Sequence, residues 1–248
     1  LGERLFSLGT PGIAKISFNG MEFLRPYGTF SHPNSLAGFY LLLYFFVLGD
    51  KRFSRFLLLK YVALFVFSCL IYLSFSKLAI AVYLLLNVVF NLIKNKIKCK
   101  LFMINRLIVL IVIPAIFLVP IGDPFSLFKR SELIGSSIEI IKAHPVVGAG
   151  LKNYLYFQSE FKSAYPLFIN QPVHNIFLLF ISETGIVLGL GLIYSLYSIL
   201  RSNIKKVGYL LISVLVLTGM FDHYWLTLIQ NFILMGVVLS ITNFQDRV

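Results

Sequence analysis

Apolar residues along this chain gather in long continuous runs. Seven runs contain few or no charged residues, at about 34–49, 56–75, 78–93, 105–121, 175–200, 208–221 and 225–242. A bilayer core about 30 Å thick needs roughly 20 helical residues, and about 17 are tolerated. The second, fifth and seventh runs meet this length, whereas the first, third and sixth are expected to be tilted, kinked or partly interfacial. A membrane β-barrel would show alternation instead of continuous runs. The pattern therefore predicts an all-α, polytopic membrane helix bundle with about seven transmembrane helices.

The polar segments between the runs suggest how the chain is organised. Residues 123–173 form a long loop between the fourth and fifth predicted spans, and the apolar spacing in 131–143 predicts an amphipathic helix that His144-Pro145 ends. A second short helix is expected around 152–163, and both are expected to lie against the membrane interface. Pro33 is expected to open the first helix, a position where proline is tolerated.

Composition excludes several protein classes. Hydrophobic residues make up 58% of the chain and charged residues 13%, and the mean hydropathy is +0.86. A soluble domain carries roughly 25% charged residues. Soluble, disordered and collagen-like classes are therefore excluded.

The net charge of +12 is distributed unevenly between alternate inter-run segments. One set of segments holds 13 basic and two acidic residues, whereas the other holds nine basic and eight acidic residues. Lysine and arginine accumulate in short cytoplasmic loops, so the first set is assigned to the cytoplasm. Residues 1–33 and 123–173 are then external, and the charge indicates topology instead of nucleic-acid binding. Because an external start without a signal peptide needs something to export it, we expect residues 1–248 to be a single transmembrane domain, the carboxy-terminal part of a longer protein.

Four histidines fall on the predicted external side: His32, His144, His174 and His223. His174 and Asn175 lie where the polar segment meets the fifth apolar run, so His174 can face water while its helix is anchored in lipid. Each of the other three also has a structural interpretation, as a helix cap, an interface residue or a hydrogen-bond acceptor in a turn. No histidine pair has the spacing of a zinc motif, so no metal site is expected.

Two external arginines, Arg25 and Arg130, are candidate diphosphate ligands, because a planar guanidinium binds phosphate oxygens in pairs. Contact with lipid phosphates is the alternative for both. Asn34 lies in the first turn of its helix, where free backbone amides favour an anion. Glu183 is expected to pair structurally with a neighbouring helix. Gly148-Ala149-Gly150 follows no strand, so it predicts a sharp turn or close backbone packing instead of a dinucleotide site.

Three stretches of the sequence contain related motifs: RPYGTFSHPNSLAGF (25–39), HPVVGAGLKNY (144–154) and HNIFLLFISETGIVLGLG (174–191). Together they resemble the O-antigen ligase and O-antigen polymerase superfamily of bacterial membrane glycosyltransferases. The resemblance spans residues 25–191 and implies a GT-C-like fold in the bacterial cytoplasmic membrane, with the active face external. It also implies roughly ten to twelve membrane helices in the whole protein.

The resemblance implies an inverting, metal-independent glycosyltransferase without a cofactor. Such an enzyme moves a glycan from undecaprenyl diphosphate to an acceptor hydroxyl on a glycan, lipid or protein. His174 would be the general base, and Arg25 and Arg130 would hold the diphosphate. His32, Asn34 and Asn175 are possible substrate-binding residues.

Two other functions fit parts of the sequence. A transporter or flippase of lipid-linked oligosaccharides would need ionisable residues along its spans, and Glu183 is essentially the sole example. A noncatalytic membrane scaffold would not depend on any histidine. The candidate residues gather at one predicted surface, which favours chemistry over transport.

Overall fold

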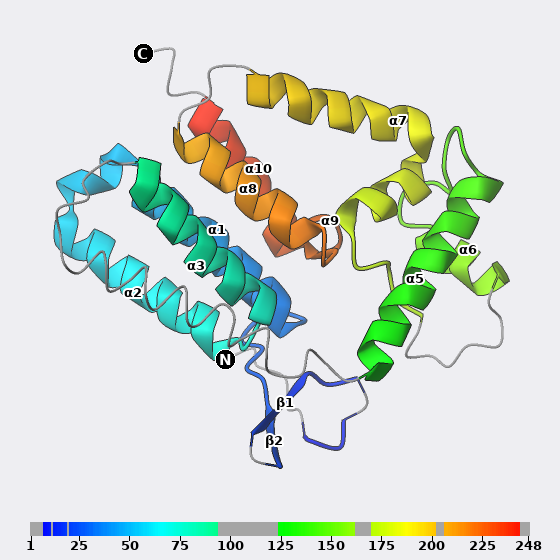
Figure 1. Ribbon diagram of the computed structural model, residues 1–248, viewed down its shortest axis with the longest axis horizontal. Helices are drawn as coiled ribbons and strands as arrows, with labels where there is room; N and C mark the ends of the chain where they lie inside the picture. The colour runs from blue at the N-terminus through cyan, green and yellow to red at the C-terminus, as the bar shows by residue number, and fades with distance from the viewer. Residues whose placement is uncertain are drawn as a thin grey trace. The chain divides into compact units, whose positions relative to one another are not determined.

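The computed structural model describes residues 7–10, 12–18, 20–93, 124–161, 170–201 and 206–243. This part of the chain is mostly helical (Figure 1), with α1 Pro33–Gly49, α2 Leu57–Leu73, α3 Lys77–Ile93, α5 Pro124–Ala143, α6 Tyr154–Phe161, α7 Ile176–Arg201, α8 Lys206–Gly219, α9 Tyr224–Thr227 and α10 Ile229–Asn243. A 3-10 turn, η1 Lys51–Arg55, joins α1 to α2. The predicted helical character of the apolar runs is thus confirmed, apart from 105–121, which lies outside the described residues.

Membrane-spanning length is reached by one described helix. Within α7, Ile176–Ile199 is long and apolar enough to cross a bilayer, whereas the other apolar helices of the described part have 10 to 17 residues. At 1.5 Å per residue, a 17-residue helix covers about 26 Å, slightly less than the hydrocarbon core. The expectation of about seven spans therefore stays a prediction for the remaining helices.

The last apolar run is not one continuous helix. Leu228 adopts an extended conformation between α9 and α10, with φ −107° and ψ 118°. The Thr227 hydroxyl lies 3.1 Å from the carbonyl oxygen of His223 and 2.8 Å from its ring Nδ1. Thr227, the last residue of α9, is therefore held against His223, the residue that precedes this helix.

A β-hairpin in the amino-terminal segment departs from the all-α expectation. Strand β1, Lys15–Phe18, pairs antiparallel with β2, Met21–Leu24. The connection contains Gly20 at φ +80°, a backbone conformation that glycine adopts without steric cost in hairpin turns. An ion pair between Lys15 and Glu22 at 2.9 Å joins the two strands. The sequence Asn19-Gly20 is a dipeptide that two-residue hairpin turns prefer. The hairpin was not predicted because the segment 1–33 was only assigned to the external side of the membrane.

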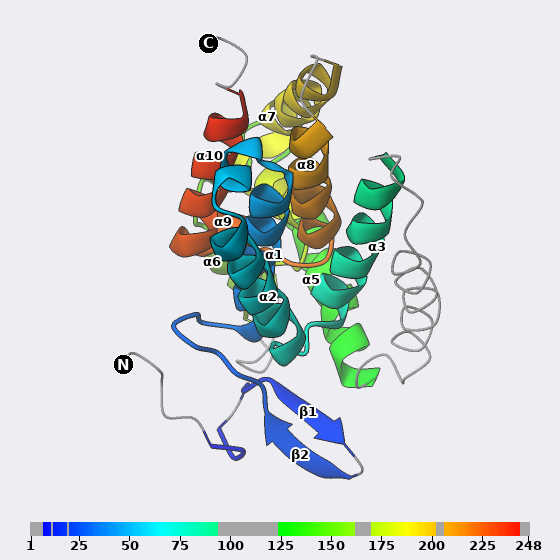
Figure 2. The same ribbon diagram turned by 90° about the vertical axis from the view of Figure 1, so that its left-hand side faces the viewer.

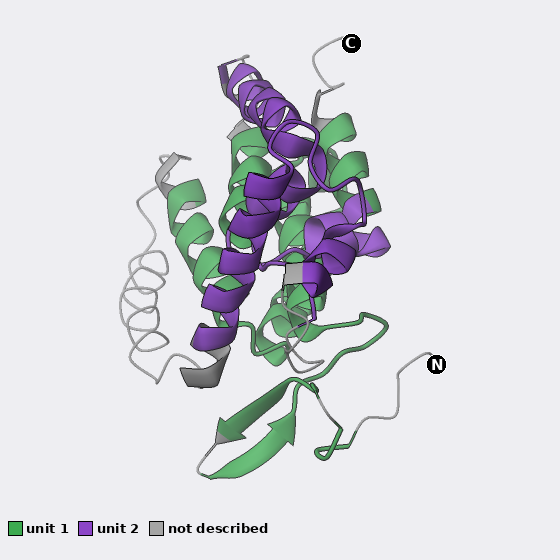
Figure 3. Ribbon diagram, turned by 90° about the vertical axis from the view of Figure 1, so that its right-hand side faces the viewer, with its two compact units in different colours: residues 1–121, 206–218, 233–248 green, residues 122–205, 219–232 purple. Residues whose placement is uncertain are grey.

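The chain divides into two compact units (Figure 3). The first unit comprises residues 1–121, 206–218 and 233–248. In it α1 and α2 run alongside each other (Figure 2), and Leu41, Leu42 and Phe45 of α1 are fully buried. Tyr44 donates a hydrogen bond to Asn87 of α3 at 2.9 Å. By contrast, α2 exposes many large apolar side chains, as a helix that faces lipid does: Leu57, Leu58, Leu59, Tyr61, Val62 and Phe65.

The second unit comprises residues 122–205 and 219–232. Its apolar core joins α5, α6 and the start of α7 through Leu133, Ile140, Ala149, Tyr154, Val173 and Leu179. The predicted helices around 131–143 and 152–163 are therefore confirmed, and Ala143 ends α5 directly before His144-Pro145. Two apolar residues of α5 face this core, whereas Ile134 and Ile138 stay about 40% exposed. The buried apolar residues of α5 thus pack against protein. From the sequence, this helix was expected to lie against the membrane interface, and this protein core was not predicted.

The middle of α7 is broken at Gly185, where φ is 81° and ψ is 171°. Residues 145–150 fill the break with three backbone hydrogen bonds of 2.8 Å: Ala149 N–H to Ser182 O, Gly150 N–H to Glu183 O, and Ile186 N–H to Pro145 O. A Cβ on Gly148 would lie 2.5 Å from Gly185 N. The predicted close backbone packing of Gly148-Ala149-Gly150 is thus confirmed. The Glu183 carboxylate accepts from the backbone N–H groups of Lys152 and Tyr154 at the start of α6.

Candidate functional site

His174 lies immediately before the cap of α7. The Asn175 Oδ1 atom accepts hydrogen bonds from the N–H groups of Phe177 and Leu178 at 2.9 and 3.0 Å. Asparagine is favoured at this position because its oxygen satisfies amides that the helix leaves unpaired. Val173, on the other side of His174, is 1% exposed. The imidazole is therefore carried by a short segment that is fixed on both sides.

Two side chains, Asn175 in this segment and Arg130 in α5, hold the turn at residues 220–223 by hydrogen bonds. Asn175 Nδ2 donates to the carbonyl oxygen of Met220 at 3.1 Å, and Arg130 Nη1 donates to that of Phe221 at 3.4 Å. Gly219 precedes the turn, and a Cβ there would lie 2.9 Å from Ile176 Cγ1. The absence of a side chain at Gly219 thus allows the start of α7 to approach the end of α8.

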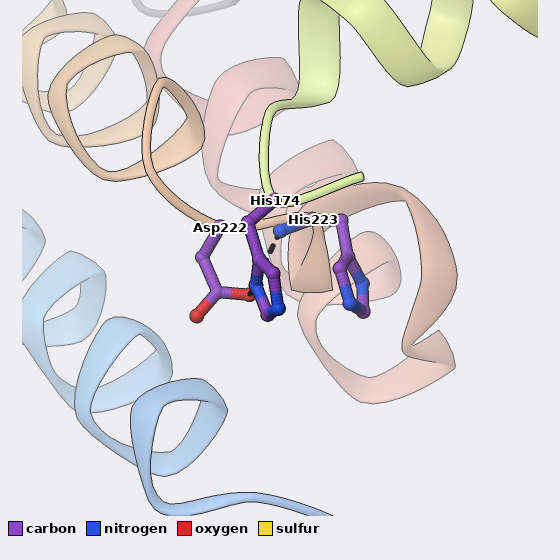
Figure 4. Close-up of side chains that lie close together, drawn as sticks. All are labelled: His174, Asp222 and His223. Carbon is purple, nitrogen blue, oxygen red and sulfur yellow. Dashed lines mark hydrogen bonds and ion pairs between the residues drawn. The ribbon is translucent and has the colours of Figure 1, made fainter. Parts of the chain in front are cut away.

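This turn brings Asp222 to His174 (Figure 4). Asp222 Oδ1 lies 3.5 Å from His174 Nδ1, and the side chains are 8% and 23% exposed, respectively. The same carboxylate oxygen accepts the backbone N–H of His223 at 2.8 Å. A buried carboxylate beside one ring nitrogen favours a proton on that nitrogen and stabilises the imidazolium when it forms. On the other side of the ring, His174 Nε2 lies 3.1 Å from Gln171 Nε2.

His223 lies beside His174, with ring centroids 5.1 Å apart and ring planes inclined by 39°. Burial is the main cause that lowers the pKa of His223 to about 4; the Asp222 carboxylate opposes this shift, and the His174 ring adds to it. His223 is therefore neutral at physiological pH. The ring adds no positive charge beside His174.

The depressed pKa of His223 predicts an acid-sensitive fold. Because the folded-state pKa of about 4 is below the usual 6.5, stability is complete above pH 6.5 and falls as the pH drops towards 4. The full shift corresponds to at most about 3 kcal/mol, which solvent screening at this partly exposed ring reduces. We expect the melting temperature to fall less steeply with acidification for His223→Gln than for the wild type, as measured by scanning fluorimetry. Identical pH dependence in both proteins would contradict this role of His223.

Metal-binding capacity is also present in this cluster. Within the described part of the chain, His174, Asp222 and His223 form one group whose ligand atoms lie within 4.8 Å of one another. Tetrahedral zinc, with bonds of about 2.0 to 2.1 Å, needs ligand atoms roughly 3.4 Å apart. The two imidazoles lie side by side, and His174 has Asp222 and Gln171 at its two nitrogens. Binding of a metal would therefore require the two imidazole rings to reorient. The spacing of His174, Asp222 and His223 in the sequence did not indicate that these three residues lie together.

The other predicted site residues form a cluster in the first unit. Arg25 Nη2 donates to Asn34 Oδ1 at 2.8 Å, and Arg25 Nε donates to the carbonyl oxygen of Ser74 at 2.9 Å. His32 caps α1, since its Nδ1 accepts from the N–H of Asn34 at 3.1 Å. Pro33 follows as the first helical residue, as predicted. These contacts give Arg25, His32 and Asn34 a structural role in joining the amino-terminal segment to α1 and α2.

The structure thus brings His174, Asn175 and Arg130 to one turn in the second unit and places Arg25, His32 and Asn34 together within the first unit. It adds Asp222 and Gln171, which sequence reasoning did not select. Gln171 precedes His174 by three residues, with a proline between them, so this short separation could have predicted that the two side chains lie close together. Asp222 is 48 residues from His174 in the chain. The sequence feature that could have pointed to it is its position in a turn on the predicted external side, where His174 also lies.

Comparison with known proteins identifies the family. A model of the O-antigen ligase family matches residues 35–193, which include most of α1, His174 and the break in α7. No curated protein and no solved structure matches the chain. Because this match covers more than half of the sequence, the chain belongs to the O-antigen ligase family of membrane proteins.

Proposed function

We propose that this protein transfers a glycan from an undecaprenyl-diphosphate carrier to an acceptor hydroxyl at the outer face of the cytoplasmic membrane. Ligase or polymerase activity is what membership of the family implies. The observation that carries the proposal is the His174–Asp222 pair, 3.5 Å apart, with both side chains less than a quarter exposed. An imidazole with a carboxylate at Nδ1 presents its other nitrogen as a base, the arrangement that activates hydroxyl nucleophiles.

The reaction is a displacement at the anomeric carbon of the carrier-linked sugar. His174 Nε2 removes the proton of the acceptor hydroxyl as its oxygen forms the new glycosidic bond. The bond between the anomeric carbon and the phosphate oxygen breaks, and undecaprenyl diphosphate leaves with the electron pair. Attack opposite the leaving group inverts the anomeric configuration. Asp222 stabilises the positive charge that His174 acquires.

Arg130 is proposed to hold the diphosphate. Its guanidinium reaches the carbonyl of Phe221, the residue before Asp222, so the cation and the base are attached to the same turn. Charge-assisted hydrogen bonds to phosphate oxygens stabilise negative charge as it develops on the leaving group. Arg25 is proposed as a second diphosphate ligand. Such a role has to coexist with its hydrogen bonds to Asn34 and Ser74.

An external location of the site is supported by the charge pattern. The alternate segments that contain His174, Asp222 and Arg130 have nearly balanced charge, whereas the opposite segments carry the basic excess. We propose a multi-pass topology in which residues 123–173 and the 220–223 turn lie outside the cytoplasm. Carrier-linked glycans displayed on the outer leaflet then have direct access to His174.

An assay in detergent micelles separates a transferase from a flippase, because micelles leave no compartment into which a lipid can be transported. With full-length protein, undecaprenyl-diphosphate glycan, an acceptor and a metal chelator, we expect an acceptor enlarged by the glycan, detected by mass spectrometry. Arg130→Ala is expected to raise the donor KM about tenfold, since a hydrogen bond between charged groups is lost. Transport in sealed vesicles without product in micelles would favour the flippase instead.

A further inference from the structure

The Gln171 side chain contacts Nε2 of His174, the nitrogen that acts as the base in the proposed reaction. Its amide Nε2 lies 3.1 Å from His174 Nε2. The backbone between the two residues contains Pro172, whose ring fixes one of the intervening backbone torsions. Gln171 is therefore held beside the imidazole by the same segment that carries His174.

Two neighbours of His174 select the same tautomer. An amide nitrogen has hydrogens and no lone pair to offer, so Gln171 contacts His174 favourably only if His174 Nε2 is unprotonated. Asp222 Oδ1, 3.5 Å from Nδ1, favours the proton on Nδ1. Gln171 then donates to the Nε2 lone pair, which is the lone pair of the general base.

The 3.5 Å separation between Nδ1 and Asp222 is longer than a hydrogen bond, and Nδ1 has no hydrogen-bond partner among the residues that the structure describes. Catalytic contacts of this kind often shorten only when substrate binds and charge develops. Gln171, at 3.1 Å, therefore makes the shorter of these two contacts to the ring. This places the amide where an incoming hydroxyl has to bind.

We propose that Gln171 is a positioning residue for the acceptor, a proposal that rests on the transferase function. Before the acceptor binds, the Gln171 amide contacts His174 Nε2 at the position that the acceptor hydroxyl takes during the reaction. The acceptor displaces the amide, which then hydrogen-bonds a second polar group next to the attacking hydroxyl. Sugars carry such neighbouring hydroxyl groups, so the acceptor class that fits best is a glycan.

The contact itself is tested without any glycan transfer. Diethyl pyrocarbonate acylates the unprotonated nitrogen of imidazole, and mass spectrometry resolves the rate at each histidine. In full-length protein without substrates, we expect Gln171→Ala to accelerate acylation of His174 several-fold while that of His144 is unchanged. Asn170→Ala, at the exposed neighbouring position, is the matched control and should behave as the wild type. Equal His174 rates in all three proteins would overturn the contact.

The positioning role is tested by the kinetics of transfer. Gln171→Ala is expected to raise the acceptor KM about fivefold, with a smaller change in kcat, since one neutral hydrogen bond is lost. Gln171→Glu places a carboxylate at Nε2 and favours the imidazolium, so the acidic limb of the rate profile should move up by about one pH unit. An unchanged acceptor KM and pH profile would overturn positioning even if the acylation rates differ. If wild-type protein transfers no glycan, the proposed function fails, while the acylation result still decides whether Gln171 contacts His174.

Discussion

Replacing His174 with alanine is expected to lower the rate of glycan transfer by a factor of about 10² to 10⁴, the usual contribution of a positioned general base. The variant leaves Asp222 and Arg130 in place but removes the group that takes the acceptor proton. Asn175, which caps α7, is unchanged, so the fold around the turn should persist. Initial rates of acceptor enlargement in micelles, at saturating donor, measure the effect.

His144→Ala is the matched control for this variant. His144 belongs to the same unit and stacks against Phe157, with ring centroids 4.6 Å apart. It follows the end of α5 and makes a packing contact, so its loss should change the transfer rate less than about threefold. A His174→Ala protein that transfers glycan as fast as His144→Ala would remove the general base from the mechanism.

Substituting alanine for Gly185 is expected to destabilise the second unit by about 3 kcal/mol or more, from strain and a steric clash together. The residue has φ +81°, and its Cβ would collide with the backbone carbonyl of Val146 and lie 2.7 Å from Val147 N. Movement of residues 145–150 would break the hydrogen bonds that close the break in α7. The melting temperature of the purified protein in detergent should fall by several degrees.

Gly191→Ala provides the comparison within the same helix. Leaving aside the chain neighbours and the nearby backbone of the helix itself, no atom of the described residues lies within 4 Å of the position a Cβ would take at Gly191. Alanine in an open helical position is stabilising by about 0.5 to 1 kcal/mol relative to glycine. Equal melting temperatures for the two variants would contradict the assignment of Gly185 as a required backbone break.

Most helices could be predicted from the sequence because continuous apolar runs determine them locally. The run 34–49 became Pro33–Gly49, and 56–75 became Leu57–Leu73. The break at Gly185 was not predictable from hydropathy, since the apolar run continues through it. Its cause is tertiary: residues 145–150 supply the backbone partners that the helix lacks there. The paired glycines at 148 and 150 indicated close packing, but not against which segment.

The candidate site was predictable in part for a similar reason. His174 could be selected because it marks the change from a polar to an apolar segment, a property of local sequence. Its contact with Asp222 depends on the path of the chain through α7 and α8, which spacing alone does not reveal. Arg25 was expected to bind diphosphate and Asn34 to bind substrate, and the structure shows a hydrogen bond between these two side chains. Whether they also bind diphosphate stays a prediction.

Release of undecaprenyl diphosphate in a single turnover tests the central claim most directly, because it reports the bond that breaks while His174 takes the proton. Full-length enzyme in excess over carrier-linked glycan would be mixed with and without acceptor, and the released carrier quantified by mass spectrometry. We predict release at a rate that depends on acceptor, in amounts equal to the enlarged acceptor, and at least about 100-fold slower for His174→Ala. Release by His174→Ala at the wild-type rate would contradict the account.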